Sequence, residues 1–535
     1  MPLTVQAANS ASTPDDSNAG PLFSNHQSPA ETNQTVSSDS TITLPRSAAP
    51  ETSTDHLIDV YYDYIHPAHP FVIPRELYKS NPNVLPEHLK RAMRFIARHI
   101  SDLCQDGVAG VAGVADIMNI NMPTDGFKVQ TYLTLTIASY ARCERAQGDT
   151  TLFHAINTAQ EIGMHLEGYG HVESPIMQES WRRTWWELYS IASMIRVLTP
   201  TTTALDAAYD RILPSNDTDY DRCQSTESRT LDNMQDRFFT HDNTPYSSFA
   251  YRIEAVRILN TVLEATQQTS SHPSQTTNSL TASIKSYLLS NPAPNGNTFT
   301  DDNIDENLSC AHTTINLASI LLHLPHSTLA TQPLQTICAT DRSQTTRSRS
   351  PTDLQSHTNN ALAAANAITQ LLVSRPTASF LSLSPCFSCP LAFAVTVQLS
   401  AYCLRDSQKP EVDRAQALYL REYIQLSLSA LDNIGQNWPV AKAVKSQLAE
   451  FAREILGRPR ANVKAQSQTK NARRQIESGI GDAPVAVQGF HASGLQMPLG
   501  LEGAPRVDLE DDFWLRSFVE DPFDLSFIGQ SHGQS

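Results

Sequence analysis

Apolar residues recur at three- and four-residue steps along residues 55–456, and this spacing constrains the fold more than any other feature of the chain. One such series is Leu89, Met93, Ile96 and Ile100. Side chains spaced in this way share one face of an α-helix, whereas the strict alternation of a half-buried strand is scarce throughout. The pattern predicts an all-α fold, with one large multi-helix domain over residues 55–456.

Individual helices can be placed within this domain. We expect them over residues 127–145, 151–166, 178–197, 246–265, 304–324, 359–373, 387–404, 412–431 and 440–456. Gly148 and Asp149 predict a break between the first two. Residues 266–280 are rich in Ser, Thr and Gln and predict a loop, followed by a short helix over 284–289. No fixed-period repeat is present, so a solenoid is not expected.

The two ends of the chain differ in composition from the helical part. Residues 1–54 are rich in Ser, Thr, Asn, Pro and Asp. Such a segment cannot bury enough apolar surface to offset the entropy cost of ordering, so we expect it to be disordered. Residues 457–506 are polar and unpatterned and are predicted to be a linker. The N-terminus lacks the apolar core of a signal peptide, and Gln398 ends the longest apolar run, so no membrane partner is expected.

The charge balance limits the partners of the folded part. The formal net charge is -16 and the pI is about 5.5. Proteins that bind DNA through their own surface usually present a basic patch to the phosphates, so direct DNA binding is not expected from this composition. The 8 cysteines are scattered and follow no secretory signal. Reduced thiols in a nucleus or cytosol are the expected state.

Several motifs follow one another in residues 55–215. They lie at 56–71, 129–135, 155–166, 179–189 and 212–217. The most specific is residues 179–189, which read Glu-x2-Arg-Arg-x-Trp-Trp-x-Leu-Tyr. In this order the motifs resemble the regulatory, or middle homology, domain of fungal zinc-cluster transcription factors. The resemblance implies a nuclear transcriptional regulator of a pathway or gene cluster, such as one for secondary-metabolite biosynthesis.

The Arg-Arg-x-Trp-Trp motif has a structural interpretation. Trp185 and Trp186 can bury large areas between neighbouring helices. Arg182 and Arg183 can pair with carboxylates or stack on aromatic rings. We therefore expect these residues to identify the fold and not a catalytic site. The His-Pro pairs within residues 66–70 are likewise expected to shape a helix exit and not to bind a metal.

The zinc cluster of the family is not found in this sequence. That cluster needs six cysteines that begin as Cys-x2-Cys-x6-Cys and hold two zinc ions. Here no cysteine precedes Cys104, and the one Cys-x2-Cys pair is Cys386 and Cys389, with Cys403 as the nearest further thiol. We expect this pair to be core thiols, with no metal and no cofactor in the protein. DNA contact would then be indirect, through another transcription regulator, or would need a further DNA-binding module.

An acidic and aromatic segment covers residues 507–528. Its bulky side chains include Phe513, Trp514, Leu515, Phe518 and Phe523, interleaved with Asp and Glu. This composition is typical of activation segments, which dock into a co-activator groove as short amphipathic helices. The alternatives are a terminal helix that packs on the protein's own body and a solvated tail. Basic residues over 453–474 predict either a diffuse nuclear-import signal or a solvated linker. Co-activators, and a second copy of the chain as a homodimer, are the expected partners.

An enzyme is the main competing hypothesis. Asp301, Asp302 and Asp305 fit the DDxxD pattern of all-α terpene synthases, in which carboxylates bind magnesium. No second magnesium motif follows, and acidic residues favour helix N-termini in any protein. We therefore expect that the protein is not an enzyme. The alternatives are a magnesium-dependent terpene-synthase-like enzyme and a non-catalytic helical scaffold.

A calcium site is also suggested and then excluded by the sequence. Asp217, Asp219 and Asp221 have the spacing of an EF-hand loop, but Arg222 stands where that loop needs glycine. An ordinary loop is predicted there.

Overall fold

The structure is a computed structural model, and it describes the chain with several gaps. The described residues are 53–100, 113–199, 202, 204–205, 211–224, 229–237, 239, 245–267, 273–292, 304–329, 350–373, 375–403 and 410–456. Within these ranges the chain is helical, and the β-type pairing is an isolated bridge between Ile212 and Thr230. The predicted all-α fold is confirmed for these ranges. Residues 1–52 of the predicted N-terminal disordered segment, the linker and the acidic tail lie outside them, whereas residues 53 and 54 begin the first helix.

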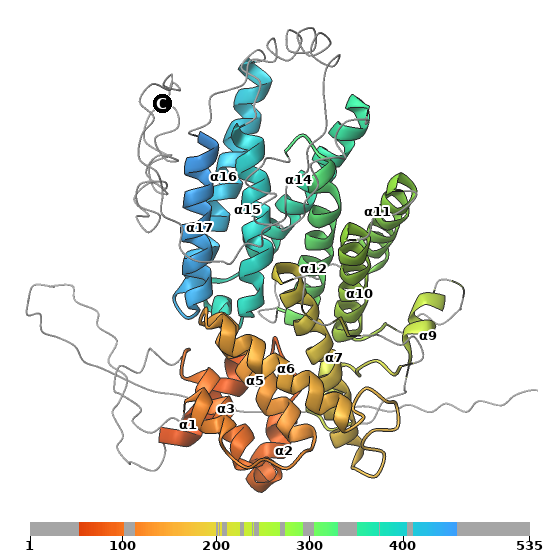
Figure 1. Cartoon of the computed structure of the whole chain (residues 1–535), viewed down its shortest axis with the longest axis vertical. Helices are drawn as coiled ribbons and strands as arrows, with labels where there is room; N and C mark the ends of the chain where they lie inside the picture. The colour runs from red at the N-terminus through yellow and green to blue at the C-terminus, as the bar shows by residue number, and fades with distance from the viewer. Residues whose placement is uncertain are drawn as a thin grey trace, which may run out of the picture. The chain divides into compact units, whose positions relative to one another are not determined.

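The first group of helices covers residues up to 198. It comprises α1 (Ser53–Val60), the π-helix η1 (Tyr61–Ile65), α2 (Arg75–Ser80), η2 (Pro82–Val84), α3 (Glu87–Ala97), α4 (Val114–Met118), α5 (Gly126–Ala141), α6 (Arg145–Glu161) and α7 (Pro175–Leu198). Helix α5 packs against α3, α6 and α7. These helices lie together in Figure 1, coloured red to yellow. Helix α7 is therefore an inner element of this group.

The second group is a row of longer helices. It comprises α8 (Asp217–Asp221), α9 (Leu231–Asp236), α10 (Ser248–Gln267), α11 (Pro273–Ser290), α12 (Glu306–His323), η4 (Leu324–His326), α14 (Pro351–Val373), η6 (Thr377–Leu381), η7 (Pro385–Phe387), α15 (Ser388–Cys403), α16 (Pro410–Gly435) and α17 (Pro439–Leu456). Helix α12 packs between α10 and α14, and α15 packs against α14, α16 and α17 (Figure 1). Contacts of α10 with α7, and of α17 with α5, join the two groups.

The predicted break at Gly148 is wrong. Gly148 lies inside α6, and the chain turns earlier, at Cys143, whose φ is +65°. A Cβ at position 148 would lie 2.7 Å from the ring of Tyr140 on α5. The glycine therefore permits a close approach between two helices and does not end one.

The predicted loop over 266–280 is also wrong for most of its length. Helix α11 begins at Pro273 and has 18 residues, so the short helix expected at 284–289 is only its second half. Proline is favoured at the first position of a helix, where its missing N–H has no partner to lose. Leu280, Ile284 and Tyr287 form its buried face. Although α11 is rich in Ser and Thr, one apolar face is enough to keep it helical, because packing against the rest of the protein supplies much of the stability of a helix.

Helix α15 is the most apolar element. The segment Pro385–Cys403 has a mean hydropathy of 1.4 and is long and apolar enough to cross a membrane, but 72% of it is buried against other parts of the protein. A mostly buried apolar helix is common at the centre of a folded domain. We therefore assign α15 to the core.

Gly170→Ala is expected to lower the free energy of unfolding by about 1–3 kcal/mol, because alanine would be strained in this backbone conformation. The φ of Gly170 is +76°, and a Cβ there would lie 2.7 Å from the ring of Trp181. The measurement is urea denaturation followed by far-UV circular dichroism. Gly168→Ala in the same loop is the matched control, since a Cβ at position 168 meets nothing within 4 Å. Equal midpoints for the two variants would contradict the prediction.

Candidate functional site

Helix α7 carries three ionisable side chains on one buried face. Glu179, Arg183 and Glu187 are spaced four residues apart, so they lie one above another along the helix. Arg183 and Glu187 are each 0% exposed, and Glu179 is 6% exposed. Buried charges are costly unless they are paired and hydrogen-bonded, so the partners of this face define the site.

Arg183 joins α7 to the segment that contains α8. Its guanidinium donates hydrogen bonds to Glu179 (2.9 Å), to Asp217 (2.7 Å) and to the carbonyl of Ser215 (2.7 Å). The same group lies 4.1 Å from the centroid of the Tyr220 ring. Burial opposes the charge, but Asp217 and Glu179 raise the pKa of Arg183 above its ordinary value. The loop predicted at Asp217 is therefore wrong: these residues form a one-turn helix that is held by α7.

Glu187 joins α7 to α10 and to the chain after η1. Arg252 donates to both of its carboxylate oxygens, at 2.8 and 2.9 Å, and Nδ1 of His69 lies 2.7 Å from Oε1. Nε2 of His69 lies 3.0 Å from the hydroxyl of Ser384, which precedes η7. Burial alone would raise the pKa of Glu187, but Arg252 and His69 lower it overall. Three segments thus meet at this carboxylate, and Ser384 connects a fourth segment to it through His69.

Asn307 on α12 closes the two halves into one network. Its side-chain oxygen accepts from Arg252 (3.2 Å), and its amide donates to Asp217 (3.1 Å). The resulting buried network consists of His69, Glu179, Arg183, Glu187, Asp217, Arg252, Asn307 and Ser384. Its two arginines pair with its three carboxylates inside the fold, where hydrogen bonds are strong and a missing partner is costly. The arrangement therefore holds segments together and does not present reactive groups to a substrate.

The two tryptophans of the motif also face the interior. Trp186 is 0% exposed and its ring nitrogen donates to the carbonyl of Ile212 (2.9 Å). Trp185 is buried, with the guanidinium of Arg211 5.0 Å from its ring centroid. Arg182 lies near the surface and pairs with Glu179. The motif therefore contributes packing and ion pairs around α7.

His66 gives the protein a pH dependence that can be measured. Both ring nitrogens are buried and have no hydrogen-bond partner among the described residues. Burial, and then the charge of Arg183, lower the pKa of His66 to about 3. Protons then bind more readily to the unfolded chain between pH 3 and 6.5, so stability rises with pH across that range.

Replacing His66 by phenylalanine is expected to remove this contribution. Between pH 6.5 and 5 the wild type should lose about 2 kcal/mol of stability that His66→Phe keeps, since one pKa unit corresponds to about 1.4 kcal/mol. Urea denaturation at the two pH values measures the difference. His56→Phe, at an exposed position, is the control and should behave as the wild type. Identical slopes for wild type and His66→Phe would refute this account.

Asp305 lies at the start of a helix, as expected from the sequence. Asp305 caps α12: its carboxylate accepts from the backbone N–H of Leu308 (2.9 Å) and from the hydroxyl of Ser248. Asp301 and Asp302 lie outside the described residues. Within the described part of the chain, no group of three or more His, Cys, Asp or Glu side chains is placed to hold a metal ion.

The cysteine pair lies at the start of α15. Cys386 and Cys389 are half-buried and line a cavity. Burial raises the pKa of the Cys386 thiol, which therefore stays protonated near neutral pH. The residues of the predicted activation segment, Phe513, Trp514, Leu515, Phe518 and Phe523, lie outside the described residues.

Sequence reasoning missed most of the buried network. The repeat of charges at 179, 183 and 187 was the available signal, because residues four positions apart share one face of a helix. The partners of this face give no sequence signal, since Arg252 follows Glu187 by 65 residues.

Comparisons with known proteins bear on the same region. Residues 124–301 match the family model for the fungal specific transcription factor domain. The chain is similar to the C6 finger domain transcription factor iacK of Pestalotiopsis fici (strain W106-1 / CGMCC3.15140), with 25% identity over 418 residues. The alignment covers 76% of this chain and 60% of the relative, so the chain spans about three fifths of the relative's length. No solved structure matches significantly.

Proposed function

We propose that this chain is a nuclear transcriptional regulator that controls a pathway or gene cluster, because residues 124–301 match the family model for the fungal specific transcription factor domain. The observation that carries the proposal is the agreement between this match and the similarity to a C6 finger transcription factor over 418 residues. Secondary-metabolite biosynthesis is the proposed kind of pathway. In this proposal the protein is not an enzyme.

The helical domain serves as a scaffold for partners in this proposal. Its buried network fixes α7, α10 and α12 against one another. This favours a rigid domain whose surface binds partner proteins over a domain that changes its conformation around a catalytic centre. The net charge of -16 favours DNA contact through a DNA-bound regulator or a separate basic module over contact through this domain. Homodimerisation is part of the proposal.

The acidic segment over 507–528 supplies activation in the proposal. Its alternation of acidic and bulky apolar residues suits a short amphipathic helix that docks into a co-activator groove. Co-activators are therefore the proposed partners of this segment.

A reporter assay in yeast tests the proposal. The full chain, and separately residues 500–535, are fused to an unrelated DNA-binding domain. We expect activation by both fusions and its loss when Phe513, Trp514 and Phe518 are all changed to alanine, because those side chains would fill the co-activator groove. The control changes the exposed Phe153 to alanine in the full-length fusion and should retain activity. Activation that survives the triple change would refute the role of this segment.

The magnesium-dependent enzyme is not favoured. The carboxylate of Asp305 already accepts hydrogen bonds as the cap of α12. Magnesium-dependent turnover of a prenyl diphosphate by the purified chain, abolished by Asp302→Asn, would overturn the preference for a regulator.

A further inference from the structure

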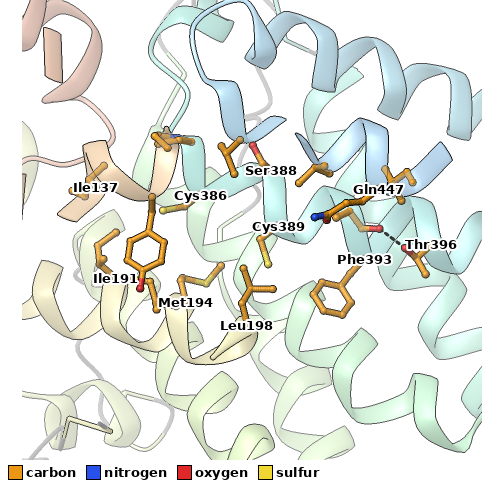
Figure 2. A pocket seen from close by; sticks show the side chains of 18 of the residues that line it. Ile137, Ile191, Met194, Leu198, Cys386, Ser388, Cys389, Phe393, Thr396 and Gln447 are labelled. Atoms are coloured by element: carbon orange, nitrogen blue, oxygen red, sulfur yellow. Dashed lines mark hydrogen bonds between the residues drawn. The ribbon is translucent and has the colours of Figure 1, made fainter. Parts of the chain in front are cut away.

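A half-open groove of about 520 Å³ lies between α11, α12 and α14. Helix α12 packs against both of the other helices (Figure 1). The groove differs from the pocket that Cys389 and Phe393 line, whose walls are almost entirely apolar (Figure 2). Its volume lies within the range of about 300–1,000 Å³ that is usual for small-molecule sites, and its lining combines apolar with polar side chains. Such a groove can select a ligand by chemistry as well as by size.

A polar stripe of α12 forms one wall of this groove. The stripe consists of His312, Asn316, Ser319 and His323, which share one face of the helix because they are three or four positions apart. Their exposed fractions are 8%, 5%, 6% and 2%. Polar side chains that are buried this deeply need hydrogen-bond partners. The partners therefore show which atoms of the stripe remain available to a ligand.

Three polar groups of the stripe already have a partner. Nε2 of His312 lies 2.7 Å from the carbonyl oxygen of Pro292, and Nδ1 of His323 lies 2.9 Å from Nδ1 of His357. The side-chain amide of Asn316 donates to the carbonyl of His312 (2.8 Å). These contacts hold the side chains of the stripe in place without a ligand.

Two oxygen atoms of the stripe remain available. Oδ1 of Asn316 and the hydroxyl of Ser319 have no hydrogen-bond partner among the described residues. Neither belongs to the unpartnered side-chain atoms that are closed off from solvent, so both are accessible. Because the two residues are almost completely buried and line the groove, a ligand reaches these oxygens through it. Water can pair with them in the free protein, and a ligand hydroxyl can replace that water.

The groove also favours a negatively charged group. Its described lining contains the exposed Lys285 of α11 and no Asp or Glu, and Lys285 makes no ion pair among the described residues. Over the whole of α11, α12 and α14 the acidic residues are Glu306 and Asp353. Glu306 is paired with Arg375, and Asp353 lies in the first turn of α14. In a chain with a net charge of -16, this acid-poor groove suits an anion better than a cation.

The rest of the lining is apolar and limits the size of the ligand. It comprises Ile284, Leu288, Ala363, Ala364, Ala367 and Leu371. An apolar cavity of about 150 Å³ holds one benzene molecule, so about 520 Å³ accommodates two fused rings with polar substituents.

We propose that this groove binds a small organic acid that has an apolar body and one hydroxyl group. The carboxylate pairs with Lys285, and the hydroxyl pairs with Oδ1 of Asn316 and with the hydroxyl of Ser319. The apolar body packs on α11 and α14. The ligand contacts three helices at once, so its binding stabilises the folded protein. The site goes beyond the proposed role in transcription and does not depend on it, because binding is measured on the purified protein.

Three matched compounds test the two polar contacts. 6-Hydroxy-2-naphthoic acid carries both groups, 2-naphthoic acid lacks the hydroxyl, and 2-naphthol lacks the carboxylate. Isothermal titration calorimetry of the full chain near neutral pH measures their affinities. We expect saturable binding of 6-hydroxy-2-naphthoic acid, about threefold to tenfold tighter than the binding of either other compound.

Lys285→Met tests the contact with the carboxylate. We expect the affinity for both naphthoic acids to fall about threefold to tenfold, because only these two compounds carry a charge that pairs with the lysine. The affinity for 2-naphthol should not change. Lys442→Met, which removes an exposed lysine on α17 outside the lining, should leave all three affinities unchanged.

Asn316→Leu combined with Ser319→Ala tests the contact with the hydroxyl. We expect the double variant to bind 6-hydroxy-2-naphthoic acid no more tightly than 2-naphthoic acid. Ser319→Ala alone should reduce the preference, and it decides if the double variant fails to fold. The matched control is Ser309→Ala, which removes another buried serine of α12 outside the lining and should retain the preference.

A filling variant tests the location of the site independently of the polar contacts. Ala367 of α14 lines the groove, and Ala367→Phe would occupy it with an apolar ring. We expect loss of binding of all three compounds, with an unchanged far-UV spectrum. Should this variant fail to fold, the comparison of Lys285→Met with Lys442→Met still decides.

Four outcomes would overturn the proposal. The first is the absence of saturable binding, which would mean that the groove holds only water. The second is an affinity for the naphthoic acids that Lys285→Met leaves unchanged, and the third is a preference for the hydroxyl that persists without Asn316 and Ser319. The fourth concerns the acidic segment over 507–528 as a competing occupant. If changing Phe513, Trp514 and Phe518 to alanine made the full chain bind 6-hydroxy-2-naphthoic acid at least tenfold more tightly, that segment would be the natural occupant.

Discussion

Glu187→Ala is expected to lower the free energy of unfolding by about 3–5 kcal/mol, the usual cost of removing one partner of a buried ion pair. Arg252, itself only 4% exposed, would lose both carboxylate contacts and would remain charged without a counter-ion. His69 would also lose its contact at 2.7 Å. The measurement is the urea midpoint by far-UV circular dichroism, together with the yield of folded protein.

Two further variants separate charge from shape. Glu187→Gln keeps the size of the side chain but removes the charge, and we expect it to be nearly as unstable as Glu187→Ala, because Arg252 would still lack a counter-ion. Glu264→Gln is the matched control: Glu264 also faces an arginine, Arg196, at 3.7 Å, but its side chain is 52% exposed. A change within about 0.5 kcal/mol is expected there. A stable Glu187→Gln protein would show that hydrogen bonding alone maintains the site.

Trp186→Ala is the second large effect, with an expected loss of about 3–5 kcal/mol, because the cavity left by a fully buried tryptophan cannot close. The ring is 0% exposed and lies 5.6 Å from the Tyr189 ring in an edge-on arrangement. The carbonyl of Ile212 would in addition lose its hydrogen bond from the indole (2.9 Å). Thermal and urea denaturation would both report the loss.

The control for this prediction is an aromatic residue at the surface. Phe153 on α6 is 62% exposed, and Phe153→Ala should change the stability by less than about 0.5 kcal/mol. Trp186→Phe keeps most of the volume and loses the donor, so its stability should lie between the wild type and Trp186→Ala. A Trp186→Ala protein as stable as the Phe153→Ala protein would mean that α7 is not fixed by this ring.

The fold class was readable from the sequence because helical periodicity persists wherever one face of a helix is buried. The positions of helix ends were less readable. A glycine at position 148 predicts a helix break, yet Gly148 lies inside a helix and contacts the ring of Tyr140. Only the packing of α5 on α6 distinguishes the two roles. Pro273 likewise begins a helix inside a stretch that reads as a polar loop.

The candidate site was readable only in part. A sequence can show that Glu179, Arg183 and Glu187 share a face, because their spacing is local. It cannot show that Asp217 and Arg252 approach that face, since these contacts depend on how distant segments pack.

The buried network also has a consequence for which piece of the chain can fold alone. The match to the fungal specific transcription factor domain covers residues 124–301, but His69 precedes this range, and Asn307 and Ser384 follow it. A fragment cut at those limits would keep Glu187 and Arg252 and would lose the groups that complete their hydrogen bonds. A fragment that keeps the whole network must therefore extend at least from His69 to Ser384, so the region matched by the family model is shorter than the region that the network joins.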